Sequence, residues 1–279
     1  MNGESSILIR RLRFQMPAVR GVIERRVLVN FRCDPGMLAR ILPAPFRPKL
    51  IRGWGMAGIC LIRLGKIRPA FLPALAGPTS ENAAHRIAVE WDENGATREG
   101  VFIPRRDTNS VLNQLVGGRI FPGVHHAANF RVRETGDRFN LEVRSDDGAA
   151  FVRVLARGAD QLPGGSIFHS LTEASEFFRS GSLGWSARPA RDEFDGLELR
   201  CDEWWMEPLA VERVESSFFA DCEMFPPGST EFDSAFLMRN LRHTWHARGR
   251  MRFCSRRPED AELTATKSRR FAASAAAGA

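Results

Sequence analysis

The sequence has no tyrosine and only three lysines, Lys49, Lys66 and Lys267, so arginine supplies almost all of its positive charge. It also lacks any CxxC pair. Its five cysteines lie far apart, at Cys33, Cys60, Cys201, Cys222 and Cys254. A structural zinc site or a disulfide framework needs closely spaced or evenly paired cysteines. We therefore predict reduced, mostly buried thiols, with no metal site built on cysteine.

Long apolar runs are also missing. No segment approaches the roughly 18 apolar residues of a membrane span. The first residues, MNGESSILIRRLRF, scatter arginines where a signal peptide needs an unbroken apolar core. We expect a cytoplasmic protein without a membrane partner. The 279 residues, 43% apolar and 26% charged, are enough to bury a sizeable core.

The net charge of +7 raises the hypothesis of a nucleic-acid partner. The arginines, however, are spread along the whole chain, and no recognised nucleic-acid motif accompanies them. Spread charge is typical of a solvated surface. Nucleic acid is therefore not the partner we expect first.

Alternation of apolar and polar residues predicts a series of strands. An Asn94-Gly95 turn, a strong hairpin signal, joins two of them. Asp34 and Pro35 are suited to begin a short helix that ends near residue 42, and Ser170 with Glu173 forms a capping box for a helix to about residue 179. A further helix is expected over 108–116. The predicted strands are 22–33, a glycine-broken pair in 50–66, 84–92, 97–105, 123–133, 138–145, 149–157, 195–202, 209–222, 230–238 and 240–253.

This order of elements predicts a mainly β protein, with mainly antiparallel strands closed or nearly closed into a barrel. Closure leaves few exposed strand edges and suits the glycines that would bend the strands. We expect a basic lead-in over 1–19, one domain over 20–255 and a disordered tail over 256–279.

Most polar residues that could carry chemistry lie in the stretch 97–130. His125 and His126 are neighbours on one predicted strand, so their side chains point to opposite faces and cannot jointly hold a metal. The odd spacing of His243 and His246 separates those two in the same way. We predict no metal site. No dinucleotide fingerprint, phosphate loop or nucleophile elbow is present, so we also predict no cofactor.

His85, His126 and His243 each lie on the apolar side of a predicted strand. Each is either a buried histidine satisfied by a neighbour or an interior group for acid–base chemistry near neutral pH. Glu99 shares a side with Val101 and Ile103. Inside a barrel its pKa would rise unless an arginine paired with it, whereas a slip in the alternation would leave it solvated. The arginines available for that pairing are Arg105, Arg106 and Arg119.

The stretch GVFIPRRDTNSVLNQLVGGRIFPGVHHAANF resembles the central part of the acetoacetate decarboxylase-like superfamily, and is most similar to its domain of unknown function 2071 family. The pattern LMRNLRHTWHARGRM near the C-terminus is also similar to that family. The resemblance implies a cone-shaped antiparallel β barrel with an interior pocket. For the decarboxylases of that superfamily, the resemblance implies a pair of lysines after Gly-Arg. One of these lysines forms a Schiff base with a β-keto acid. Here the pair falls on His126 and Ala127, so imine-forming decarboxylation is not predicted.

Our first hypothesis is an interior site for a small carboxylic or keto acid. His126 or Glu99 would act as general base, and Arg119 would hold the carboxylate. The further candidates for ligand contact are His85, Arg105 and His243. The second hypothesis is a non-catalytic binding protein on the same barrel. The third is a basic surface module, in which the face from Arg242 to Arg252 and the tail contact nucleic acid or an anionic surface. The sequence leaves the ligand, the reaction and the oligomeric state open.

Overall fold

The computed structural model describes residues 18–71, 73, 78–111, 123–188 and 193–252. In this part of the chain, thirteen strands form one mixed sheet. Two helices accompany it, α1 (Pro35–Ile41) and α3 (Leu171–Ser180). The strands are β1 (Val19–Cys33), β2 (Arg47–Pro48), β3 (Leu50–Ile51), β4 (Trp54–Pro69), β5 (Ser80–Glu93), β6 (Ala96–Thr108), β7 (His126–Thr135), β8 (Arg138–Ser145), β9 (Phe151–Gly158), β10 (Leu183–Ala187), β11 (Glu193–Cys201), β12 (Glu207–Ser216) and β13 (Thr230–Arg252).

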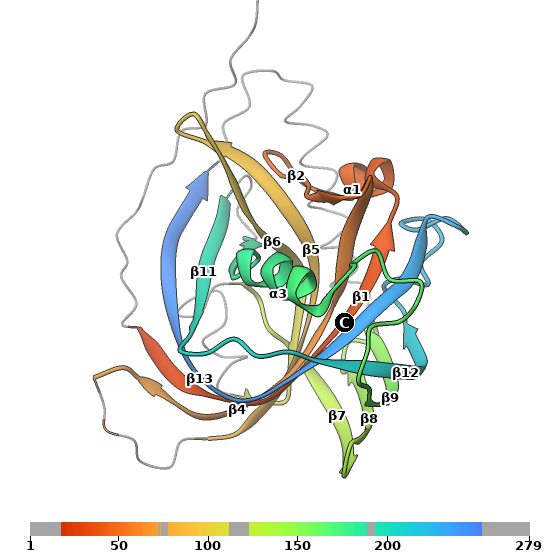
Figure 1. Cartoon of the computed structure of the whole chain (residues 1–279). Helices are drawn as coiled ribbons and strands as arrows, with labels where there is room; N and C mark the ends of the chain where they lie inside the picture. The colour runs from red at the N-terminus through yellow and green to blue at the C-terminus, as the bar shows by residue number, and fades with distance from the viewer. Residues whose placement is uncertain (1–17, 72, 74–77, 112–122, 189–192, 253–279) are drawn as a thin grey trace, which may run out of the picture.

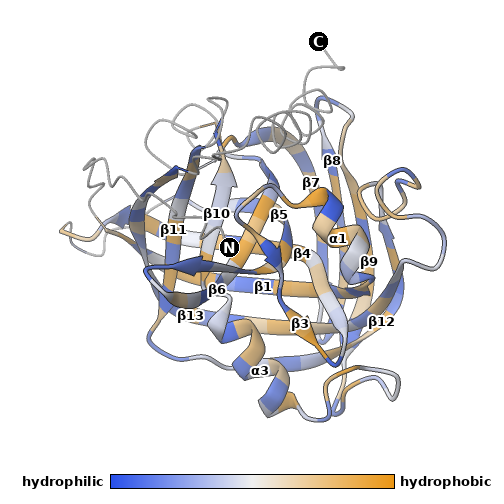
Figure 2. Ribbon diagram, turned by 90° about the horizontal axis from the view of Figure 1, so that it is seen from above, coloured by the Kyte–Doolittle hydropathy of each residue, from blue (hydrophilic) through white to orange (hydrophobic). Residues whose placement is uncertain are grey.

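Five long strands, in the order β13-β1-β4-β5-β6, form the centre of the sheet (Figure 1). Their outer edges are connected twice. Through β10 and β11, β6 is linked back to the second half of β13. Through β7, β8, β9 and β12, β6 is also linked to the first half of β13. The described strands therefore close into a ring by two routes. Seen from above, β10 and β11 lie on one side of the long strands and β8, β9 and β12 on the other (Figure 2). The predicted mainly β barrel is confirmed.

The local signals in the sequence give the expected turns and caps. Asn94 and Gly95 have φ values of 53° and 75°, as the tight hairpin between β5 and β6 requires. The side chain of Asp34 accepts a hydrogen bond from the backbone N–H of Met37 at 2.8 Å and caps α1. Ser170 accepts one from the backbone N–H of Glu173 at 3.1 Å and caps α3. The predicted hairpin and both of these helices are confirmed.

The C-terminal region differs from the prediction in one respect. The strands predicted over 230–238 and 240–253 form a single strand, β13. Asn240 has a φ of 54°, a conformation that asparagine tolerates better than most residues. It shifts the alternation without ending the strand, and this is why the sequence pattern reads as two strands. β10, with only five residues, is too short to show a clear alternation and was not predicted.

The long strands are buried on both faces. One face packs Val27, Ile59 and Ile87 against residues of β8 such as Leu141, and we call it the β8 face. The other packs Leu28 and Cys60 against residues of α3, and we call it the α3 face. Because successive side chains point to opposite faces, neighbouring residues in the same strand belong to different cores.

Several predicted features lie outside the described residues. These are the lead-in over 1–17, most of the helix predicted for 108–116, Arg119, and the tail over 256–279. Within the described residues, neither helix has the length and apolar character needed to cross a membrane.

Candidate functional site

An interior cavity of about 190 Å³ lies on the α3 face, between the long strands and the β10–β11 pair. Much of its wall is apolar, with Ile62 and Leu64 from β4 and Leu197 and Leu199 from β11. Trp245 of β13 adds a large aromatic surface. The polar part of the wall consists mainly of Arg26, Cys60, Ser80, Asn82, Arg86, Arg106, Ser110, His125 and Ser182.

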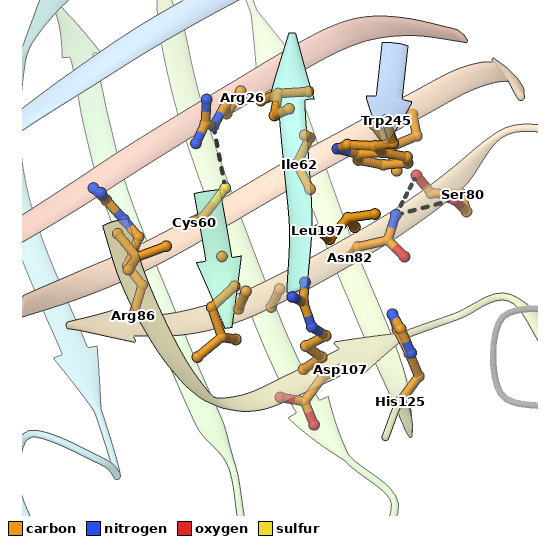
Figure 3. A pocket seen from close by; sticks show the side chains of 18 of the residues that line it. Arg26, Cys60, Ile62, Ser80, Asn82, Arg86, Asp107, His125, Leu197 and Trp245 are labelled. Atoms are coloured by element: carbon orange, nitrogen blue, oxygen red, sulfur yellow. Dashed lines mark hydrogen bonds between the residues drawn. The ribbon is translucent and has the colours of Figure 1, made fainter. Parts of the chain in front are cut away.

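Strand register explains how the arginines come together. Cys60 of β4 lies opposite Ala84 of β5, and Ala84 lies opposite Arg106 of β6. In the adjacent rows, Arg26 lies opposite Ile62, and Arg86 lies opposite Gly58. Residues directly opposite in antiparallel strands share a face. The long arginine side chains therefore lie around Cys60, as Figure 3 shows for Arg26 and Arg86.

None of these three arginines has a carboxylate partner among the described residues. Arg26 donates from Nε to Cys60 Sγ at 3.4 Å and stacks on Trp204. Arg86 donates from Nη2 to Asn30 Oδ1 at 2.5 Å and lies over the ring of Phe178.

Within the described ranges, Arg106 is held by a hydrogen bond from its Nε to Ser186 Oγ at 3.3 Å. Burial lowers the pKa of Arg106 to about 10. Burial and the nearby charge of Arg26 lower the pKa of Arg86 to about 10 as well. Both groups remain cations at neutral pH, so the cavity carries positive charge that the described residues do not neutralise.

His125 is the histidine that faces this cavity. Its Nδ1 is 3.2 Å from the carbonyl oxygen of Gly123. A carbonyl only accepts, so Nδ1 carries the proton and Nε2 is left as an acceptor. Burial and the charge of Arg106 lower the pKa of His125 to about 3, so the ring is neutral at neutral pH.

Gly123 has a φ of 83°, and a Cβ there would lie 3.1 Å from Arg106 Nε and 2.9 Å from Ser186 Cβ. Glycine therefore allows the chain to approach Arg106 closely, just before the strand that begins at His126.

His126 points to the β8 face, where it belongs to a different cluster. Its Nδ1 is 3.3 Å from Asp147 Oδ2. Arg105 bonds both Asp147 and Asp107, each at 2.8 Å. Burial and Arg105 lower the pKa of His126, against the opposing effect of Asp147. Burial raises the pKa of Asp107 to about 6 despite Arg105. Asp107 also borders the cavity, but its carboxylate is engaged by Arg105.

His85 lies beside this cluster, opposite Arg105 in the strand register. It is fully buried and packs on the ring of Phe218, with ring centroids 4.8 Å apart. Neither ring nitrogen has a hydrogen-bond partner among the described residues. Burial, together with the charge of Arg105, lowers its pKa to about 3. The structure therefore brings His85, Arg105 and His126 together, but on the face opposite the cavity.

Glu99 and His243 lie elsewhere. The Glu99 carboxylate is 2.6 Å from Lys49 Nζ, and its side chain is 39% exposed. Partial burial would raise its pKa, but the hydrogen bond and the charge of Lys49 lower it. The pairing that the sequence suggested for Glu99 is thus made by a lysine near the surface, not by an interior arginine. His243 is buried beside Trp245 and lines a separate groove with Arg20 and Arg242.

Sequence reasoning missed Arg26, Arg86 and Cys60 as site residues. The alternation in 22–33 and 84–92 placed Arg26 and Arg86 on the sides taken to face solvent. The signal that could have identified them is the stretch MAGICLIRL in β4, which has no polar alternation. A continuous apolar run is typical of a strand buried on both faces. It implies that polar residues opposite it in β1 and β5 are interior.

The arginines at the end of β13 are neutralised by their neighbour β11. Arg248 pairs with Glu198 at 2.7 Å, and Arg252 pairs with Glu193. Arg250 lies 3.6 Å from Asp195. β11 thus supplies acidic partners for these three arginines, and the basic surface module stays a prediction.

The lysines and the possible metal ligands also limit the chemistry of the site. Neither Lys49 nor Lys66, the two lysines in the described part of the chain, lines the cavity. Lys267 lies outside the described residues. Within the described ranges, no three histidine, cysteine or acidic side chains are grouped closely enough to hold a metal ion.

Comparisons with known proteins give structural matches only. No family model and no curated protein matches the sequence. Acetoacetate decarboxylase from Legionella pneumophila is 11% identical with a TM-score of 0.55, over 90% of this chain and 93% of that one. An acetoacetate decarboxylase-like enzyme from Sphingomonas wittichii RW1 is 15% identical with a TM-score of 0.51, over 84% and 91%. The enduracididine biosynthesis enzyme MppR, complexed with pyruvate, is 13% identical with a TM-score of 0.51, over 90% and 94%. The chain therefore has the acetoacetate decarboxylase-like fold.

Proposed function

We propose that the cavity on the α3 face binds a small organic acid through Arg26, Arg86 and Arg106. The observation that carries the proposal is that these three guanidinium groups line one cavity without a carboxylate partner among the described residues. A buried cation without a carboxylate partner, as Arg86 is among the described residues, is costly, and a ligand carboxylate would reduce that cost. Guanidinium groups also match carboxylate geometry with two parallel hydrogen bonds.

The size and walls of the cavity narrow the ligand class. A volume of about 190 Å³ is small, compared with the roughly 300–1,000 Å³ of sites for drug-sized molecules. The apolar side chains of Ile62, Leu64 and Leu197 suit a short carbon body behind the carboxylate. The structurally similar enzyme MppR is known in complex with pyruvate, which has this size and charge. We therefore infer a short-chain carboxylic or keto acid.

The chemistry available differs from imine formation. A Schiff base needs a lysine amine in contact with the ligand, and neither described lysine lines the cavity. For proton transfer we propose His125 in place of His126, because His125 lines the cavity and its Nε2 is left as an acceptor. The acid–base roles of His126 and Glu99 stay predictions, as does membership of the domain of unknown function 2071 family.

The test is a thermal-shift and calorimetric comparison of pyruvate with its uncharged methyl ester. Ligand that binds only the folded state stabilises it by about 2.7 kcal/mol at a hundred times Kd. We expect pyruvate to raise Tm and the ester to have no effect. Arg106→Gln should weaken pyruvate binding by about tenfold or more, the cost of one charge-assisted hydrogen-bonded contact.

The matched control is Arg133→Gln, which removes the same charge from an exposed position on β7. It should leave pyruvate affinity unchanged. If neither pyruvate nor other small acids such as acetoacetate, lactate and succinate raise Tm, the cavity is not an organic-acid site. Equal losses in Arg106→Gln and Arg133→Gln would show that general charge, not the cavity, attracts the anion.

Turnover is tested separately. Exchange of the methyl protons of pyruvate for deuterium, followed by NMR, reports proton removal next to the carbonyl. We expect wild type to exchange faster than His125→Ala. Binding without any catalysed exchange would favour the non-catalytic binding protein.

A further inference from the structure

We propose that Cys60 is a nucleophilic thiol that faces the ligand and reacts with small electrophiles that carry a carboxylate. This inference rests on the proposed organic-acid site, because the same arginines would hold the carboxylate. It goes beyond binding, since it assigns a covalent step to a cavity that has no described lysine.

Cys60 lies among the three arginines that have no carboxylate partner in the described ranges. Its sulfur accepts a hydrogen bond from Arg26 Nε at 3.4 Å, drawn in Figure 3. It is within electrostatic range of both Arg86 and Arg106, since its negative charge would raise the pKa of each. The cations beside the sulfur would hold the carboxylate of a ligand, and with it the electrophilic carbon, next to the thiol.

A second observation points to a ligand at this position. Arg86 is 9% exposed, lines the cavity, and has an amide oxygen, not a carboxylate, as its hydrogen-bond partner in the described part of the chain. A buried guanidinium without a carboxylate partner near the sulfur is a place for the carboxylate of a ligand. Cys60 itself is only 7% exposed, but that surface faces the cavity.

The other described cysteines lack this setting. Cys33 is buried beside Thr230, and burial raises the pKa of its thiol to about 11. Burial also raises the pKa of Cys201. Cys222 is exposed and follows Asp221 and precedes Glu223, two acidic residues that would repel an anion.

The covalent step balances without a further reactant. With a keto acid, the sulfur forms a bond to the carbonyl carbon while the C=O π bond breaks. The oxygen takes up the proton that the thiol has lost, which gives a reversible thiohemiketal. The arginine cations would stabilise the negative charge that develops on that oxygen. With iodoacetate, the S–C bond forms, the C–I bond breaks, iodide leaves, and the thiol proton goes to solvent.

The experiment compares iodoacetate with iodoacetamide, which differ mainly in charge. Native full-length protein is treated briefly with each reagent, and modification at every cysteine is measured by peptide mass spectrometry. N-acetylcysteine in the same mixture gives the intrinsic preference between the reagents. A positively charged cleft concentrates anions by about 10- to 1,000-fold. We expect the preference of Cys60 for iodoacetate to exceed the reference by about tenfold or more.

Two controls make the result specific. Cys222 should show the reference preference or a lower one, and excess pyruvate should protect Cys60 but not Cys222. Arg106→Gln should reduce the preference at Cys60. The wild-type comparison and the pyruvate protection need no variant, so the test survives a variant that fails to fold.

Lack of modification at Cys60 in the native protein, or modification at the reference preference, would overturn the proposal for the thiol. If pyruvate still raises Tm in that case, the failure belongs to Cys60 and the organic-acid site stands. If pyruvate neither raises Tm nor protects Cys60, the organic-acid site fails as well.

Discussion

The two faces of the long strands treat the same residue types differently. On the β8 face, Arg25 is bonded to Glu81 and Glu134, each at 2.5 Å, and Arg105 is bonded to Asp107 and Asp147. On the α3 face, the neighbouring arginines have no carboxylate partner among the described residues. Adjacent residues of one type thus differ only in the face to which they point. The pairs are Arg25 with Arg26, Arg105 with Arg106, and His126 with His125.

This comparison separates the polar groups that stabilise the fold from those that are available to a ligand. The charges of the β8 face are satisfied by each other, so they need no ligand and are costly to remove singly. Those of the α3 face border a cavity and are left available. Because the members of each pair differ in position by one residue, each serves as the matched control for the other.

The largest expected effect separates Arg25 from Arg26. The Arg25 side chain is 3% exposed, and Arg25→Gln would leave the buried carboxylate of Glu81 with Arg63 as its remaining cation. We expect a loss of about 3 kcal/mol in the free energy of unfolding, as for breaking other buried ion pairs. Arg26→Gln removes no ion pair among the described residues, but a hydrogen bond to Cys60 and a stacking contact with Trp204, and we expect a smaller loss of about 1 kcal/mol. Urea unfolding of both variants measures the difference. Equal losses would mean that the two faces do not differ in this way.

The next effect concerns His85, which has a pKa of about 3 in the folded protein. The unfolded chain takes up a proton at this residue near its ordinary pKa of about 6.5, and the folded protein does not. Stability is therefore fully present above that pH and is lost as the pH falls toward 3. Between about pH 7.5 and about pH 4.5 the loss due to His85 is on the order of 2 to 3 kcal/mol.

His85→Leu removes this titration and the unsatisfied ring nitrogens, while it keeps an apolar side chain against Phe218. We expect the variant to lose less stability on acidification than wild type by about that amount. Urea unfolding of wild type and His85→Leu at about pH 7.5 and about pH 4.5 gives the change in the free energy of unfolding with pH for each protein. The difference between these two changes is due to His85, because the other histidines contribute equally to both. If the stability difference between His85→Leu and wild type is the same at both pH values, His85 titrates normally and is in contact with water.

Sequence reasoning reached most of the fold because the local signals are strong. The Asn94-Gly95 hairpin, the caps at Asp34 and Ser170, and the alternation in most strands each act over a few residues. The site was harder to predict, because it depends on strand register between distant segments. Arg26, Cys60 and Arg86 come together only when β1, β4 and β5 pair, and nothing local in their strands marks them as interior.

The histidine pair illustrates the same limit at single-residue resolution. The pattern correctly places His125 and His126 on opposite faces, but it does not say which face has the cavity. Apolar neighbours on the side of His126 suggested an interior, and that side is indeed interior. It is the packed core of the β8 face, however, and the cavity is on the other side.

The smallest expected effect decides between these two histidines. His125→Ala removes a neutral hydrogen-bond acceptor from the cavity, worth about 1 kcal/mol, so the affinity for lactate, whose hydroxyl can donate to it, should fall by about fivefold. His126→Ala removes a contact with Asp147 outside the cavity, so it should lower stability and leave affinity within about twofold. Calorimetric titration of both variants with lactate, beside their unfolding curves, measures the two quantities together. The reverse outcome, in which only His126→Ala weakens binding, would place the ligand on the β8 face. It would also restore His126 as the group that the sequence first pointed to.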